Sequence, residues 1–141
     1  MTFISPLQAE SAFYAAFRSG DHVGMMAVWA NNEDLICVHP MGPRLDSRDI
    51  ISASWQQILT GEPQRSFDIH LVTSWGDSDV SVHIVNEIIS VPASELQFTP
   101  VLATNVYKFT GTSWYMIAHH ASIDATSNRS VRADEQAPTR H

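Results

Sequence analysis

Several residue types that carry chemistry in other proteins are scarce in this chain of 141 residues. It has one cysteine, Cys37, so neither an internal disulfide nor a multi-cysteine metal site is available. Cys37 lies in the apolar run DLICVHP, and we expect it in the core rather than acting as a reactive thiol, because burial raises the pKa of a thiol. Lys108 is the only lysine and the net charge is −7, which leaves no basic stripe for a phosphate backbone. Nucleic acid is therefore not expected as a partner.

Long apolar runs are also missing. No apolar run approaches the roughly 20 residues that a membrane helix needs, and MTFISPLQAE lacks the basic start and apolar core of a secretory signal. We therefore expect no membrane association and a cytoplasmic location. The length suits one domain, which we place over residues 1–124. Residues 125–141 have almost no large apolar side chain and are predicted to form a mobile tail or, alternatively, to fold over a partner subunit.

Three helices are predicted in the first half of the chain, over residues 5–21, 22–30 and 48–61. The first has marked ends, because Ser5 can cap it, Pro6 suits its first turn and Gly20 suits its end. Its apolar residues follow the spacing of one buried helix face; they are Ala9, Ala12, Phe13, Ala16 and Phe17.

Strands dominate the rest of the sequence. A short strand over 35–38 ends at HPMGPR, whose prolines and glycine prevent regular structure. From residue 66 the hydrophobic period changes to two, which predicts a hairpin of 66–75 with 80–90, a loop over 91–100, and a second hairpin of 101–109 with 114–124. Early helices and a later, curled and mostly antiparallel sheet predict an α+β domain.

Two longer stretches resemble a known family. FRSGDHVGMMAVWANNEDLICVHPMGPRLDSRDIISASWQQIL is similar to the first half of SnoaL-like domains, and TNVYKFTGTSWYMIAHHAS to their last hairpin. These domains belong to the nuclear transport factor 2-like and ketosteroid isomerase-like superfamily, and the resemblance covers about residues 8–124. It implies a cone-shaped barrel in which the curved sheet and three N-terminal helices enclose a pocket.

The resemblance also implies function and assembly. It implies a pocket for a small organic ligand and a homodimer formed through the convex sheet face, for which the sequence offers an outward apolar set, Val106, Ile117 and Ile123. Enzymes of this fold typically place an Asp or Glu inside the cone to move protons, and no cofactor is expected. The last strand here offers His120 in place of an aspartate.

Strand alternation assigns faces to the last hairpin. Lys108 belongs in solvent or at an interface rim, so Asn105 and Tyr107 on the opposite face are expected to point inward. On the final strand the inward set is then predicted to be Trp114, Met116, Ala118, His120 and Ser122, and the adjacent His119 is expected to point outward.

These faces give a candidate catalytic set. His120 is interpreted as the acid or base, with Asn105 and Tyr107 as hydrogen-bond donors to a carbonyl or enolate. The alternative for His120 is a structural role, in which it hydrogen-bonds and fills the cone. His39 is placed at the cavity mouth, either as a pocket residue or as a loop anchor. Glu87 is the best carboxylate if its face is inward, a point left open because Val82, Ile84 and Ile88 form a more apolar face.

The remaining ligand-binding candidates are Trp29, Trp55, Met116 and Ser122, although both tryptophans equally suit the core. No metal site is expected, because its ligands would come from separate elements with no paired spacing, namely His39, His83, Glu87 and His120. The sequence thus favours a small-molecule-binding domain and leaves open whether it is an enzyme; if it is one, the expected chemistry is proton transfer by a cofactor-free isomerase, cyclase or dehydratase. The alternative is a non-catalytic ligand-binding, dimerisation or association module.

Overall fold

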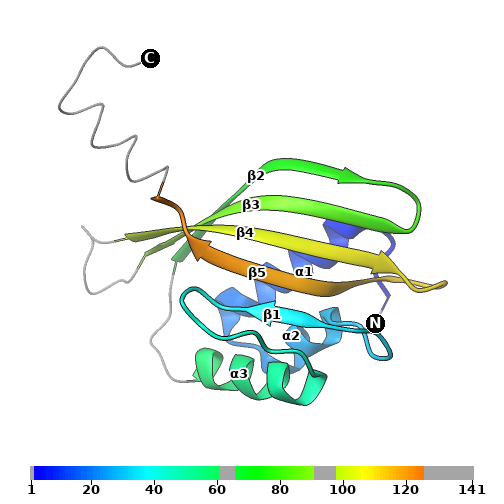
Figure 1. Ribbon diagram of the computed structural model, residues 1–141, viewed down its shortest axis with the longest axis horizontal. Coiled ribbons are helices and arrows are strands. Elements are labelled where there is room, and N and C mark those ends of the chain that lie inside the picture. Colours follow the sequence, from blue (N-terminus) through cyan, green and yellow to red (C-terminus); the bar gives the residue numbers. More distant parts are fainter. Residues whose placement is uncertain (1, 61–65, 91–97, 126–141) are drawn as a thin grey trace, which may run out of the picture.

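The computed structural model describes residues 2–60, 66–90 and 98–125 (Figure 1). Its helices are α1 (Pro6–Ser19), α2 (His22–Val28) and α3 (Arg48–Thr60). Its strands are β1 (Ile36–Val38), β2 (Ser66–Gly76), β3 (Val80–Ser90), β4 (Phe98–Phe109) and β5 (Trp114–Ile123). The α+β class and the order of elements predicted from the sequence are confirmed.

The ends of α1 form as the sequence indicates. The Ser5 side chain accepts a hydrogen bond from the backbone N–H of Gln8 at 3.1 Å, which satisfies one of the free donors of the first turn. Gly20 ends the helix with φ of 70°, a left-handed conformation that glycine adopts without a steric penalty. These two caps fix the length of the helix that covers the sheet.

The five strands form one curved sheet in the order β1-β5-β4-β3-β2. All neighbours are antiparallel except β1, which pairs in parallel with β5. Figure 1 looks onto the outer face of this sheet, with α1 and α2 behind the strands and α3 beside β1. The helices therefore cover only the inner face.

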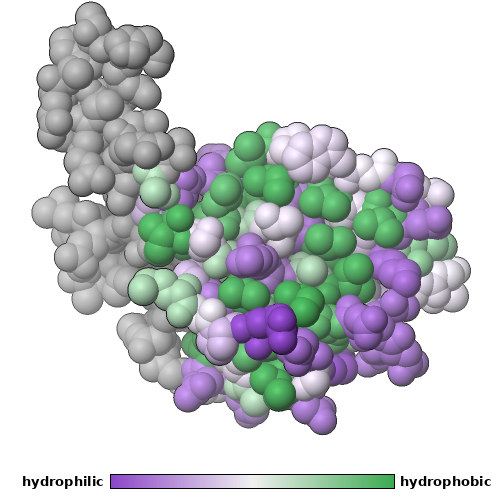
Figure 2. Space-filling model, viewed as in Figure 1, coloured by the Kyte–Doolittle hydropathy of each residue, from purple (hydrophilic) through white to green (hydrophobic). Residues whose placement is uncertain are grey.

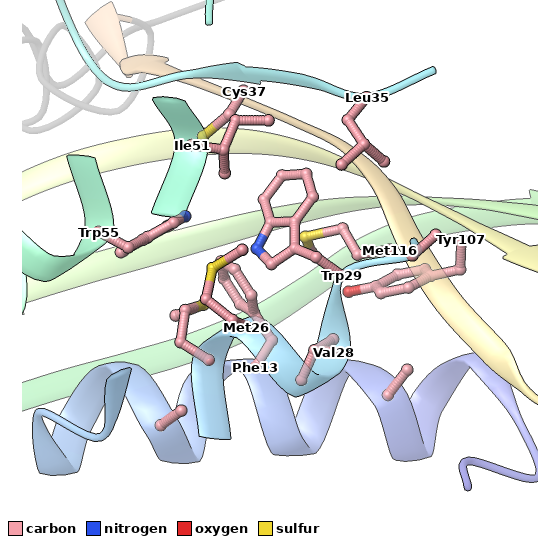
Figure 3. Packing of buried hydrophobic residues seen from close by; sticks show 14 of the residues in the cluster. Phe13, Met26, Val28, Trp29, Leu35, Cys37, Ile51, Trp55, Tyr107 and Met116 are labelled. Atoms are coloured by element: carbon pink, nitrogen blue, oxygen red, sulfur yellow. The ribbon is translucent and has the colours of Figure 1, made fainter. Parts of the chain in front are cut away.

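The core lies between the helices and the inner face of the sheet (Figure 3). Trp29 stands at its centre, 1 % exposed, with Phe13, Met26 and Met116 around it. Cys37 is fully buried, and burial raises the pKa of its thiol to about 12, so its predicted core role is confirmed.

Arg48 ties α3 to the end of α2. Its guanidinium donates to the backbone carbonyls of Met26 at 2.8 Å, Ala30 at 2.9 Å and Trp29 at 3.0 Å. These carbonyls lie at the C-terminal end of a short helix, where they lack partners within the helix and where a positive charge is favourable. The contact holds α3 in the position that lets it close one side of the cone.

The burial pattern decides which faces point inward on the two central strands. On β3 the alternate positions Ser81, His83, Val85 and Glu87 are buried, and on β4 the alternate positions Val101, Ala103, Asn105 and Tyr107 are buried. The inward orientation predicted for Asn105 and Tyr107 is confirmed. The face of β3 that the sequence left open is the one that carries Glu87.

A β-bulge in β5 overturns the faces predicted for its second half. Val106 pairs with Ala118 but Tyr107 pairs with Met116, so Ile117 is an extra residue on β5. An extra residue shifts the alternation by one position. His119 consequently points inward, 2 % exposed, while His120 and Ser122 are exposed. The predicted orientations of these three side chains were wrong for this reason, as was the inward orientation predicted for Ala118, which pairs with Val106 on the outer face.

The same shift affects the end of β5. Ile123 lies opposite the buried Val101, not on the outer face where the sequence placed it.

None of the described helices is long and apolar enough to cross a membrane. The predicted tail, from residue 126 onward, and most of the predicted 91–100 loop lie outside the described residues. The domain boundary and the cytoplasmic location stay predictions.

Candidate functional site

A cavity of about 210 Å³ opens between α1, α3 and the inner face of the sheet. Its wall is mostly apolar, formed by Phe17, Pro40, Trp55, Ile58 and Ala121. Its polar lining consists of three side chains, Glu87 from β3, His119 from β5 and His39 from the segment after β1. A mostly apolar hollow with a few polar groups is typical of a small-molecule site.

Glu87 is, among the described residues, the one carboxyl group that lines this cavity. The side chain is 2 % exposed, and its Oε2 accepts a hydrogen bond of 2.5 Å from the hydroxyl of Tyr14 on α1. The pKa of Glu87 is raised from 4.5 to about 7, mainly by burial and to a smaller extent by the nearby Glu10, and the Tyr14 hydrogen bond opposes this shift. The carboxyl group is therefore poised to gain or lose a proton near neutral pH.

Behind Glu87, a second buried carboxylate holds the elements together. Oε1 of Glu10 on α1 accepts hydrogen bonds from Tyr107 at 2.8 Å and from Asn105 at 3.4 Å, and lies 3.0 Å from Nδ1 of His83. Since a carboxylate can only accept, Nδ1 of His83 carries the proton. Glu10 thus connects α1 to both β3 and β4.

Asn105 joins this network to the cavity. Its amide nitrogen donates to the Tyr14 hydroxyl at 3.0 Å and to Glu10, so its Oδ1 faces Nδ1 of His119 at 2.6 Å. An amide oxygen only accepts, which places a proton on Nδ1 of His119. The pKa of His119 is lowered from 6.5 to about 3, mainly by burial and to a smaller extent by the nearby His39 and His120. The His119 ring is therefore neutral, and its Nε2 carries a lone pair that can accept a hydrogen bond.

His39 follows the same logic. The Ser54 hydroxyl donates to the carbonyl of Ile51 at 2.9 Å, so its oxygen accepts from Nε2 of His39 at 3.0 Å. Burial lowers the pKa of His39, which favours the neutral ring and leaves Nδ1 as an acceptor. Trp55 packs edge-on against this ring, with centroids 4.8 Å apart. His39 is thus both anchored and part of the cavity wall.

The family is decided by the extent of the sequence match. The SnoaL-like domain profile matches residues 7–126, most of the chain. This chain belongs to the SnoaL-like domain family. Its three helices and curved sheet are the fold that the resemblance implied.

Solved structures similar to this SnoaL-like domain carry diverse names. One is a candidate calcium/calmodulin-dependent protein kinase type II association domain from Thiobacillus denitrificans, 32% identical, covering 88% of this chain and 98% of that one, with a TM-score of 0.82. Another is a candidate dehydratase of the NTF2-like family from Streptomyces avermitilis, 28% identical, covering 82% and 91%, with a TM-score of 0.74. One of these two relatives is thus named as an association domain and the other as a dehydratase.

A curated relative is the F-box protein SKIP8 of Arabidopsis thaliana, 23% identical over 125 residues. The match covers 89% of this chain and 52% of that protein, so the chain spans about half the length of the curated relative it matches.

Three of the predicted ligand-binding residues meet at the cavity of this SnoaL-like domain, namely His39, Trp55 and Glu87. Trp29 and Met116 instead belong to the core, with 1 % and 0 % exposure. Asn105 and Tyr107 are buried in the polar network behind the cavity rather than in its lining. Among the described residues, no group of three or more His, Cys, Asp or Glu side chains is arranged to hold a metal ion.

His120 and Ser122 do not reach the cavity, because the bulge at Ile117 turns both to the outer face. His119, which the sequence placed outside, occupies the inward position. The exchange replaces an exposed histidine with a buried, neutral, hydrogen-bonded one. The candidate acid–base group therefore changes from His120 to Glu87.

Sequence reasoning missed the contribution of α1. Glu10 and Tyr14 are buried polar residues four positions apart, beside the buried Phe13. Residues at this spacing share one helix face, and a glutamate next to an apolar stripe signals a buried partner. That pattern was visible in the sequence, whereas the strands that supply the partners could not be identified from it.

Proposed function

We propose that this SnoaL-like domain binds a small organic molecule in the Glu87 cavity and transfers a proton on it, with Glu87 as acid and base. The observation that carries the proposal is a carboxyl group 2 % exposed, with a pKa of about 7, in a mostly apolar cavity. General acid–base groups work best when their pKa lies near the working pH. Tyr14 positions the carboxyl group through its hydrogen bond.

Isomerisation, cyclisation and dehydration are the reaction classes that fit, because each can proceed by proton transfer alone. In a dehydration, protonated Glu87 gives its proton to the departing hydroxyl, the C–O bond breaks, and the carboxylate takes a proton from the neighbouring carbon as the double bond forms. Atoms and charge balance without a further reactant. The name of the Streptomyces avermitilis relative supports this member of the set.

The first experiment titrates the side-chain carboxyl carbons by NMR. We expect one glutamate signal to titrate near pH 7 and to be absent in Glu87→Gln. Glu33→Gln is the matched control, because Glu33 pairs with Lys108 at the surface. If every signal lost in Glu87→Gln titrates at the ordinary value of a glutamate, the proposal is wrong.

The second experiment follows turnover of small cyclic alkenols and hydroxy ketones in D₂O by mass spectrometry. Water loss or deuterium uptake should be slower in Glu87→Gln than in the wild-type chain by about 100-fold or more. Glu33→Gln should react at the wild-type rate. Equal rates in wild type and Glu87→Gln would remove Glu87 from the reaction.

We also propose that the outer sheet face forms a homodimer. One row across four strands places Trp75 beside Val82, Val106 and Ala118. Trp75 is 61 % exposed, and Figure 2 shows hydrophobic side chains spread over this face. Exposed apolar surface of this kind favours self-association, and the association-domain name of the Thiobacillus denitrificans relative supports it.

Analytical ultracentrifugation tests the dimer. We expect a dimer at micromolar concentration that Trp75→Arg converts to a monomer, because a charge then lies in the apolar interface. Val23→Arg is the control, since Val23 is 81 % exposed on α2, away from the sheet face. A monomeric wild-type chain would contradict the proposal.

A further inference from the structure

The polar groups in the Glu87 cavity are all acceptors when Glu87 is ionised. Nδ1 of His119 donates to Asn105, so Nε2 of that ring carries a lone pair and can only accept. Nε2 of His39 donates to Ser54, so Nδ1 of that ring is likewise an acceptor. Glu87 uses Oε2 for Tyr14, and its carboxylate has further lone pairs to offer. A ligand that completes these groups must bring its own N–H or O–H.

No described side chain supplies a competing donor or a positive charge to the cavity. The indole N–H of Trp55 is buried without a partner and points toward the core in Figure 3, so it is not accessible to a ligand. The four described basic side chains lie elsewhere: Arg48 bonds to α2, Arg44 to Asp46 and Lys108 to Glu33, and Arg18 borders a separate hollow. An anionic or acceptor-only ligand would therefore find no complementary side chain.

The size of the cavity limits the ligand to about one ring with a short substituent. Its volume is about 210 Å³, and an apolar cavity of about 150 Å³ is known to hold benzene. Phe17 and Trp55 supply aromatic faces on which such a ring can pack. The remaining volume accommodates one small polar group.

We infer that the Glu87 cavity takes a single-ring organic molecule whose polar end is a hydrogen-bond donor, a hydroxyl or an amine, and that it discriminates against carboxylates and acceptor-only groups. The inference rests on the proposed function, since it names the ligand class of the same cavity. It differs in its test, because selectivity between ligands is measured without turnover.

Four probes of nearly equal size separate the possibilities: 1-phenylethanol, 1-phenylethylamine, acetophenone and benzoate. NMR titration at pH 8, where Glu87 is mostly ionised and cannot donate, measures their affinities. We expect the alcohol or the amine to bind about fivefold more tightly than acetophenone, the gain of one net hydrogen bond. Benzoate should bind more weakly than acetophenone, because two negative charges would share the cavity.

The pH dependence identifies which donor is preferred. An ammonium group pairs with ionised Glu87, so its affinity should rise about tenfold from pH 6 to pH 8, whereas that of the alcohol should change little. Glu87 is faced by Tyr14 and Glu10 from α1, His119 from β5 and His39, and the pKa of His119, about 3, keeps that ring neutral throughout. Tighter binding by either donor at pH 8 supports the inference.

Glu87→Gln supplies a reversal test, because its amide brings a donor into the cavity while an oxygen stays available to Tyr14. The alcohol-to-ketone affinity ratio should fall in this variant and stay unchanged in Glu33→Gln.

The wild-type probes decide the question even if Glu87→Gln fails to fold. Acetophenone or benzoate binding as tightly as both donors at pH 8, or no binding by either donor at millimolar concentration, overturns the inference. The NMR titration of Glu87 tests the proposed function independently of that result, so the two failures are distinguishable.

Discussion

Two buried glutamates in this protein, Glu10 and Glu87, differ in how many hydrogen-bond donors surround the carboxyl group. Glu10 is 6 % exposed and its Oε1 is approached by three donors, from Tyr107, His83 and Asn105. Glu87 is 2 % exposed, with one donor, Tyr14, and borders a cavity. The difference shows that burial alone does not make a carboxyl group reactive. Three donors immobilise Glu10 as a structural link, whereas Glu87 keeps lone pairs free for a ligand.

Removing the structural glutamate should have the largest effect. Glu10→Ala leaves the donors of Tyr107 and His83 buried without their acceptor and removes one of the two acceptors of the Asn105 amide, and we expect a loss of about 3–5 kcal/mol in the free energy of unfolding. Urea denaturation measures it. Glu33→Ala, which breaks only the partly exposed pair with Lys108, should cost less than about 1 kcal/mol. Similar losses in the two variants would refute the structural role of Glu10.

The adjacent histidines of β5 give the next largest difference. His119→Ala removes the partner of Asn105 and enlarges the cavity at the position of the lost ring, so it should cost about 2–3 kcal/mol of unfolding free energy. His120→Ala changes an exposed side chain and should alter the free energy by no more than about 0.5 kcal/mol. If the two variants lost similar amounts of unfolding free energy in urea denaturation, the bulge would not turn His119 inward and His120 outward.

Glu87→Gln should have an effect whose size depends on pH. Because burial raises the pKa of Glu87 from 4.5 to about 7, the folded protein binds more protons than the unfolded chain between these values. The stability from protonated Glu87 is complete below pH 4.5 and is lost as the pH rises through 7. Glu87→Gln should therefore gain about 3 kcal/mol over wild type at pH 8 and less than about 0.5 kcal/mol at pH 4.5. Urea denaturation at both pH values measures the gain. If the stability difference between Glu87→Gln and wild type were the same at both pH values, the carboxyl group of Glu87 would not ionise between them.

The helices and strands were predictable because local signals decide them. Ser5 and Gly20 bracket α1 as caps, and the change from a helical period to a period of two locates β2 and β3. The inward direction of Asn105 followed from Lys108 on the opposite face of the same regular strand. In each case the information lies within a few residues of the element.

The site was predicted only in part, because it depends on register between distant strands. His39, Trp55 and Glu87 were identified, but the inward histidine was assigned one position too late. Alternation on β5 holds up to Met116 and fails beyond it, since the extra residue Ile117 is visible only when β4 is aligned beside it. Strand alternation read from one sequence cannot detect a residue that its partner strand lacks.

The bulge at Ile117 also has a consequence for comparing genes. A relative whose coding sequence lacks that one codon would carry its cavity-facing side chain two codons after the Met116 equivalent, instead of three as here. An ungapped alignment would then match an exposed residue of one protein to a buried residue of the other, and identity in that column would measure nothing about the site. For this strand, a gap placed at Ile117 carries more functional information than any single matched residue.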